Sequence, residues 1–302
     1  MASLLAAFPT PTRAAFAAKA FGRIRLPGSG HNDGVPTPEP PATRGWNREL
    51  AGSFQTAATG YARFRPGYPP SAVGAALPTD ARRVLDLAAG TGKLTGSLID
   101  RGLDVVAVEP LPGMLAELAW RFPSVTAVLG SAEAIPLRDG IFDCVVVGQA
   151  FHWFDHERAL SEMARVLRPG GTLSLLWNHD DETDPLVRDV EAELNRIGRP
   201  DSGASGRGRR DAGPSSGHPP PPFGGHPAFT DPVLIMIRWV RRTTIEDLVG
   251  LQQTYSYVIG ADQQARDDLA VAIRGHARRR SGTDDGELAI PVICEVWRST
   301  CR

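Results

Sequence analysis

The stretch VLDLAAGTG, residues 84–92, decides the fold of this chain because it joins an apolar run to a Gly-x-Gly turn. Val84 to Leu87 is predicted to form a short buried strand, and Lys93 to Arg101 a helix that ends at Gly102. A glycine turn between a strand and a helix leaves backbone N–H groups free at the start of the helix. The pattern predicts a nucleotide-type cofactor site at this turn.

The residues around the turn separate two kinds of cofactor. The dinucleotide fingerprint has a third glycine three places after the second, but Thr95 stands there, which counts against NAD. The stretch resembles motif I of the class I S-adenosylmethionine-dependent methyltransferases, and this resemblance implies cofactor contacts from Asp86, Ala88, Gly90 and Gly92. An acidic side chain suits the ammonium group of S-adenosyl-L-methionine, whereas it would repel a pyrophosphate. An NAD(P)-dependent oxidoreductase and a non-catalytic cofactor-binding module remain the alternatives.

A second apolar run, residues 103–108, ends in Glu109 and Pro110. An acidic residue about 20 positions after the glycine turn can accept hydrogen bonds from both ribose hydroxyls. The other interpretation is a solvated carboxylate or an N-cap for the helix that contains Met114. Beside the motif above, we expect Glu109 to bind the ribose, with Pro110 and Met114 as neighbouring cofactor contacts.

The third predicted strand, residues 125–129, leads into a segment that resembles the part of the family that holds the adenine ring. Family members commonly carry Asp where this chain has Ser131. The contact to the adenine amino group is therefore expected from Ser131, from Glu133 or from a backbone carbonyl, with Ala132 beside them. An ordinary polar loop is the alternative.

The loop GQAFHWF, residues 148–154, follows another predicted strand and is rich in aromatic residues. Ligands of open α/β sheets bind outside the carboxyl ends of the strands, so this loop should face the methyl group to be transferred. Gln149 can hydrogen-bond the methionine portion, and Phe151 and Trp153 can pack on the positive sulfonium. Trp153 is also expected to contact the acceptor. His152 is the candidate general base, although such a histidine also serves as a structural hydrogen-bonding group.

The order of the predicted elements indicates an α/β fold. The segment RVLRPGG, residues 165–171, is familiar from small-molecule methyltransferases of this class, and its glycines, Gly170 and Gly171, are predicted to form a turn rather than a ligand site. We expect a doubly wound, Rossmann-like sheet of seven strands, mostly parallel with an antiparallel last strand. Beyond the elements above, strands are predicted at 142–147, 172–177, 233–240 and 289–297, and helices at 155–167, 184–197, 244–257 and 262–278.

Residues outside the core carry the candidates for acceptor binding. The segment Tyr61 to Pro69 resembles the lead-in of the trans-aconitate methyltransferase-like proteins, in which it lies across the cofactor mouth. The resemblance implies that Tyr61 or Arg65 holds a carboxylate of the cofactor or substrate, since a guanidinium offers two donors to it. Tyr255 is expected to line a substrate pocket. Packing against the sheet explains the same residues equally well.

The chain of 302 residues is interpreted as one domain with appendages. The methyltransferase domain is expected at 51–302, with a cofactor-binding core at 84–177 and further strands and helices at 232–298. Residues 1–50 have the composition of a disordered or transit-like extension. Residues 198–225 form a low-complexity excursion rich in Gly, Pro, Ser and Arg.

Composition limits the partners. The net charge is −1, no basic patch carries interleaved aromatics, and no apolar run is long enough to span a membrane, so we expect neither nucleic acid nor membrane as a partner. The three cysteines lack metal-type spacing and favour a reducing, cytoplasmic setting without a metal site. The expected partner is a small-molecule methyl acceptor with a carboxylate or a hydroxyl, bound by a monomer or homodimer.

Overall fold

The computed structural model describes residues 63–198, 225–283 and 286–302. The predictions for Tyr61, for the extension 1–50 and for residues 199–224 of the low-complexity excursion therefore lie outside the described residues. Within these ranges, no helix combines the length and the apolar character needed to cross a membrane.

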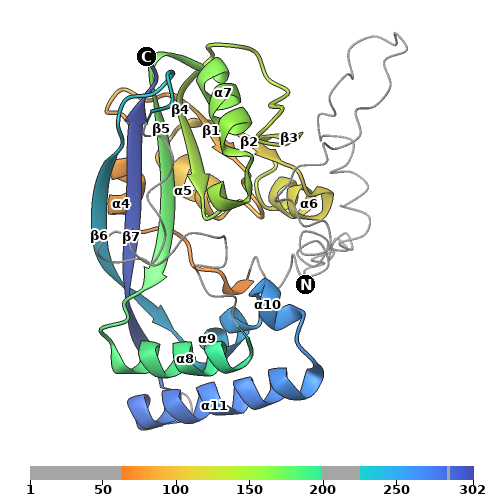
Figure 1. Ribbon diagram of the computed structural model, residues 1–302, viewed down its shortest axis with the longest axis vertical. Coiled ribbons are helices and arrows are strands. Elements are labelled where there is room, and N and C mark those ends of the chain that lie inside the picture. Colours follow the sequence, from red (N-terminus) through yellow and green to blue (C-terminus); the bar gives the residue numbers. More distant parts are fainter. Residues whose placement is uncertain (1–62, 199–224, 284–285) are drawn as a thin grey trace, which may run out of the picture.

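Seven strands form one sheet in the order β3-β2-β1-β4-β5-β7-β6 (Figure 1). The strands β1 to β5 pair in parallel, and β7 runs antiparallel to both of its neighbours, β5 and β6. This topology confirms the predicted doubly wound sheet with an antiparallel last strand. The strands are β1 (Arg83–Leu87), β2 (Asp104–Glu109), β3 (Thr126–Leu129), β4 (Phe142–Gly148), β5 (Leu167–Asp180), β6 (Val233–Thr243) and β7 (Leu288–Thr300).

Helices cover both faces of the sheet. One face packs against α4 (Pro70–Ala76), α5 (Lys93–Ile99) and α6 (Pro112–Arg121), and the other packs against α7 (His156–Val166). Alternate residues of the central strands supply the two cores, as period-two side-chain direction requires: Val84 lies in the first and Leu85 in the second. The buried residues of β1, β2 and β4 are therefore apolar, apart from Asp86 and Glu109.

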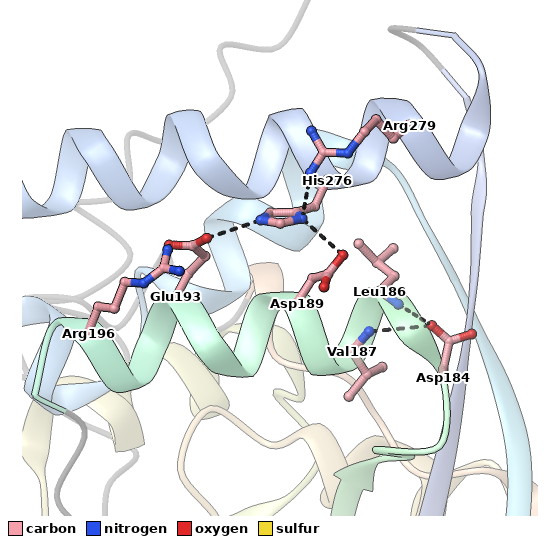
Figure 2. A network of polar contacts seen from close by, with 8 residues as sticks. All are labelled: Asp184, Leu186, Val187, Asp189, Glu193, Arg196, His276 and Arg279. Carbon is pink, nitrogen blue, oxygen red and sulfur yellow. Dashed lines mark hydrogen bonds and ion pairs between the residues drawn. The ribbon is translucent and has the colours of Figure 1, made fainter.

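A separate group of helices lies beyond the sheet end where β5 stops (Figure 1). We call α8 (Pro185–Arg196), α9 (Ile245–Gln252) and α11 (Gln263–Ser281) the helical layer; the short α10 (Ser256–Ile259) follows α9. Its apolar side chains form one buried cluster with Leu288, Ile290 and Val292 of β7. Figure 2 shows the polar network between α8 and α11, in which His276 lies 3.0 Å from Asp189 and 3.1 Å from Glu193.

The predicted helix starts are confirmed by their caps. The Asp184 carboxylate accepts hydrogen bonds from the backbone N–H groups of Leu186 and Val187, and Asp155 and Asp262 cap α7 and α11 in the same way. These side chains satisfy donors that the first helical turn leaves unpaired.

The turn predicted at Gly170 and Gly171 lies within a strand. Residues from Leu167 onward belong to β5, and the pairing of β5 with β4 shifts register between Phe142 and Cys144. Gly170 has a φ of 76°, which bends the strand locally, and its N–H donates to the carbonyl of Cys301. The glycines therefore form an irregular start to β5, and they pair with Cys301, the residue that follows β7.

Candidate active site

The glycine turn after β1 is built from left-handed backbone. Gly90 and Gly92 have φ values of 58° and 83°, and Gly92 caps the start of α5. A Cβ atom on Gly92 would lie 2.7 Å from the Phe122 ring, so α6 closes this side of the turn. A Cβ on Gly90 would meet no atom within 4 Å. The turn is thus packed at Gly92 and open at Gly90, where a ligand can approach the backbone.

Two carboxylates lie at the ends of the adjacent strands β1 and β2. Asp86 is 1% exposed and accepts a hydrogen bond of 2.5 Å from the Thr95 hydroxyl. Glu109 is 4% exposed and accepts hydrogen bonds of 2.9 Å from the backbone N–H groups of Gly90 and Leu111. Glu109 therefore fixes the position of the glycine turn. Each carboxylate oxygen retains a further lone pair for a ligand.

Burial makes both carboxylates reluctant to ionise. It raises the pKa of Asp86 to about 7, against the opposing effect of the Thr95 hydrogen bonds. It also raises the pKa of Glu109 to about 7, where the backbone hydrogen bonds oppose it and the charge of Asp86 adds to it. In the described part of the chain, neither carboxylate forms an ion pair. The site therefore favours a ligand that brings positive charge or hydroxyl groups.

The loop after β3 is fixed by side-chain contacts. Ser131 pairs with Ala134 in an isolated bridge, Ala132 is buried in the core, and Glu133 accepts a hydrogen bond of 3.1 Å from the backbone N–H of Asp155. Glu133 thus connects this loop to the start of α7. Pro110 is half-buried between β2 and α6, and Met114 is a buried residue of α6.

The aromatic loop after β4 divides into buried and exposed parts. Phe151 is 2% exposed and stacks on His156 with ring centroids 4.7 Å apart, so its ring belongs to the core. His152 is exposed, Trp153 is half-buried, and their ring centroids are 4.9 Å apart. The Gln149 side chain donates to the backbone carbonyl of Asn178 at 3.0 Å, which ties this loop to β5.

Two non-glycine residues adopt left-handed backbone among the described residues, and both are predicted cofactor contacts. Ala88 has a φ of 56° after β1, and Gln149 has a φ of 58° after β4. The strands β1 and β4 are neighbours in the sheet, so the two residues lie at one edge. Such backbone costs about 1–2 kcal/mol per residue and gathers at functional sites.

The lead-in before α4 contacts both the sheet and the α9–α10 connection. The Arg65 guanidinium donates to the Thr254 hydroxyl at 2.9 Å and lies 4.3 Å from the centroid of the Tyr255 ring. The structure thus brings together two predicted acceptor-binding residues. Tyr68 packs on Gly148 at the end of β4, where a Cβ would lie 2.5 Å from the Tyr68 hydroxyl.

A largely buried ion pair between Arg241 and Asp180 lies at the end of β5, next to the helical layer. Nη2 of Arg241 on β6 donates to both carboxylate oxygens of Asp180, at 2.9 and 2.8 Å. Asp180 and Gln252 line a small pocket between β5, α8, α9 and β7. Gln252 is 2% exposed, and its Oε1 atom has no hydrogen-bond partner in the described residues.

Several of these residues were not predicted as site residues. In the sequence, Thr95 indicates only that the third glycine of the dinucleotide fingerprint is absent. A hydroxyl in the first turn of a helix can nevertheless reach the end of the preceding strand, as Thr95 reaches Asp86. Asn178 directly follows a predicted strand, and its position at a carboxyl end was the available signal. No sequence signal pairs Asp180 with Arg241, because the two residues lie 61 positions apart.

Comparisons with known proteins agree with this geometry. The model of the methyltransferase domain family matches residues 85–175. An uncharacterized methyltransferase of Mycobacterium tuberculosis is 41% identical over 254 residues, which is 84% of this chain and 97% of that relative. A demethylmenaquinone methyltransferase of Beutenbergia cavernae is 47% identical over 92 residues, 30% of this chain and 38% of that relative.

The solved structure of a type II methyltransferase from Anaeromyxobacter dehalogenans is also similar. Its sequence is 26% identical and its TM-score is 0.53. The match covers 79% of this chain and 98% of the other chain. The mycobacterial relative aligns along almost its whole length, so the similarity extends well beyond the glycine turn. The chain belongs to the class I S-adenosylmethionine-dependent methyltransferases.

Proposed function

We propose that this enzyme transfers a methyl group from S-adenosyl-L-methionine to a small-molecule acceptor with a carboxylate or a hydroxyl, and that the turn after β1 holds the cofactor. The observation that carries the site is the pair Asp86 and Glu109. Both carboxylates are buried without a cationic partner among the described residues, beside a turn that is open at Gly90. An ammonium group and ribose hydroxyls are the groups that this arrangement fits.

Each predicted cofactor contact then has a role. Asp86 would attract the ammonium, and Glu109 would accept hydrogen bonds from the ribose hydroxyls while it positions Gly90. Other contacts would come from Ala88, Gly92, Pro110, Met114, Gln149 and Phe151, and Ser131, Ala132 and Glu133 would border the adenine. Phe151 would act through packing, because its ring is enclosed in the core.

The chain has little further chemistry to supply. S-adenosyl-L-methionine, when bound, provides a methyl group that its sulfonium already makes reactive, so alignment of the acceptor is the main task. The end of β4 faces this region, and Arg65, Trp153 and Tyr255 are the proposed acceptor contacts. His152 is exposed and would act as a base only for a hydroxyl acceptor.

The proposed class of acceptor is supported by residues of this chain rather than by the names of its relatives. The similarity to the demethylmenaquinone methyltransferase covers 30% of this chain and therefore leaves most of the chain uncompared. The lead-in at 61–69 supports membership of the trans-aconitate methyltransferase-like subgroup. All three cysteines are free and buried, which supports the proposed cytoplasmic setting.

Calorimetric titration tests the cofactor site. We expect saturable binding of S-adenosylhomocysteine and none of NAD. Asp86→Asn and Glu109→Gln should each weaken S-adenosylhomocysteine about tenfold to a hundredfold, the effect of losing a hydrogen bond to a charged group. Glu157→Gln, at an exposed position of α7, is the matched control and should leave affinity unchanged.

Binding of NAD alone, or unchanged affinity in both carboxylate variants, would contradict the proposed site. Turnover of methyl-labelled cofactor against a panel of carboxylic acids and phenols then tests the acceptor class. Binding of the cofactor without turnover of any panel member would exclude these acceptors.

A further inference from the structure

The pocket between β5, α8, α9 and β7 has a chemistry of its own. Five of its eight lining residues have aliphatic side chains, and the other three, Asp180, Glu191 and Gln252, are polar. Its interior suits a single small group about the size of a water molecule. The residues proposed above for the cofactor do not line it.

Gln252 is the pocket residue that lacks a hydrogen-bond partner for its buried oxygen. Its side chain lines the pocket, it is 2% exposed, and its Oε1 has no hydrogen-bond partner within the described ranges. A buried acceptor without a partner is costly, and native structures contain few of them. The missing partner must be a donor, because a carbonyl oxygen can only accept.

The charges at the pocket point in the same direction. Asp180 and Glu191 are both acidic, whereas the nearby cation, Arg241, does not line the pocket. The Arg241 Nη2 group already contacts both oxygens of Asp180. A bound carboxylate would therefore meet two acidic side chains and an amide oxygen without a cation of its own.

Two contacts connect the pocket with the active site. Asn178 lies two positions before Asp180 on β5, and its carbonyl accepts the hydrogen bond from Gln149 of the loop after β4. Thr254 lies two positions after Gln252, and its hydroxyl accepts the hydrogen bond from Arg65. Asp180 and Gln252 are thus each two positions from a residue that contacts a proposed site residue, Gln149 on the cofactor side and Arg65 on the acceptor side.

We propose that this pocket anchors a hydrogen-bond-donating group of the methyl acceptor, a hydroxyl or an ammonium, and discriminates against a carboxylate. The inference rests on the proposed function, because it concerns the acceptor of that reaction. Gln252 accepts the hydrogen bond from the donor group, which fills the water-sized interior, and the rest of the acceptor extends out of the pocket. Of the acceptors proposed above, this favours those that carry a hydroxyl.

Three probes with the same carbon chain test the preference: 1-butanol, n-butylamine and butyrate, titrated into the full-length protein at pH 7 and followed by NMR. The Gln252 side-chain amide signal is identified by its loss in Gln252→Met. We expect 1-butanol or n-butylamine to shift it saturably, with a dissociation constant at least tenfold lower than that of butyrate. The alcohol and amine arms distinguish the two donor groups.

Matched variants localise the effect. Gln252→Met keeps the side-chain length but removes the acceptor, and it should weaken the preferred probe at least tenfold, as read from backbone signals of α8 and α9. Gln252→Glu keeps an acceptor and should retain binding of the amine. Gln253→Met, at the exposed neighbouring position, should bind like the parent protein.

Equal binding of the three probes, no saturable binding of either donor, or an effect of Gln253→Met as large as that of Gln252→Met would overturn the assignment. A preference for butyrate would mean that Gln252 presents its NH2 group, and would also overturn it. Titration of the same samples with S-adenosylhomocysteine separates the two proposals. Failure of every protein to bind it would refute the cofactor site, whatever the probes show.

Discussion

The turn after β1 and the helical layer are held together by different kinds of contact. At the turn, Asp86 reaches Thr95 nine positions away, and Glu109 reaches Gly90 across 19. In the helical layer and its borders, Arg241 reaches Asp180 across 61 positions, and Arg65 reaches Thr254 across 189. The proposed cofactor side is thus fixed by contacts between residues close in the sequence, whereas the proposed acceptor side is assembled from distant segments. Residues of the proposed acceptor side can therefore be substituted without disturbing the contacts of the proposed cofactor side.

The largest expected effect is at the turn. Gly92→Ala introduces a Cβ at a φ of 83° and 2.7 Å from the Phe122 ring, so backbone strain and overpacking add. We expect it to lower the free energy of unfolding by about 3 kcal/mol, measured by urea denaturation. Gly102→Ala is the control, because Gly102 has a φ of 75° but open space around a Cβ, and it should cost about 1 kcal/mol. Equal losses would show that the contact with α6 does not hold the turn.

The next effect concerns the helical layer. Arg241→Met leaves the Asp180 carboxylate without its cation, and the Asp180 side chain is only 24% exposed. We expect a loss of about 2 kcal/mol in unfolding free energy and unchanged affinity for S-adenosylhomocysteine. Arg242→Met is the matched control, since Arg242 and its partner Glu287 are mostly exposed, and it should change stability by less than about 0.5 kcal/mol. A large loss of cofactor affinity in Arg241→Met would break the comparison.

The smallest effect is a pH dependence confined to the cofactor side. Because the pKa values of Asp86 and Glu109 lie at about 7, the ionised forms that we propose to bind the cofactor become scarce below that pH. Asp86 is the proposed partner of the ammonium, and its ionised fraction falls about tenfold from pH 8 to pH 6. The Glu109 carboxyl can still accept hydrogen bonds from the ribose when it is protonated, so we expect affinity for S-adenosylhomocysteine to fall about tenfold. The double variant Asp86→Asn/Glu109→Gln should lose this dependence. A flat profile in the parent protein would contradict the raised pKa values.

The stability of the ligand-free protein should move in the opposite direction. A raised pKa means that the folded protein holds these protons more tightly than the unfolded chain. The two carboxylates therefore lower stability above their unfolded pKa values, and this cost declines as the pH falls from 8 toward 5. Differential scanning calorimetry of the parent and the double variant measures it.

The same contrast explains what could be predicted from the sequence. The strand, the turn and Glu109 could be placed because each lies within one strand–helix–strand unit, whose order and spacing fix the neighbours. The pocket between β5, α8, α9 and β7 could not be predicted, because Asp180 and Gln252 are far apart in the sequence and come together only in the folded domain. The turn predicted at Gly170 and Gly171 was wrong for a related reason: their pairing partner, Cys301, is far from them in the sequence.

The position of β7 in the sheet also sets the order in which the fold can be completed. The last strand in the chain lies between β5 and β6, and β6 pairs with no other strand in the described ranges. While a ribosome synthesises the chain, β1 to β5 can assemble early, but β5 and β6 expose unpaired edges until β7 emerges. The proposed cofactor side can therefore form before the proposed acceptor side, and the nascent chain remains prone to aggregation until Leu288–Thr300 has been made.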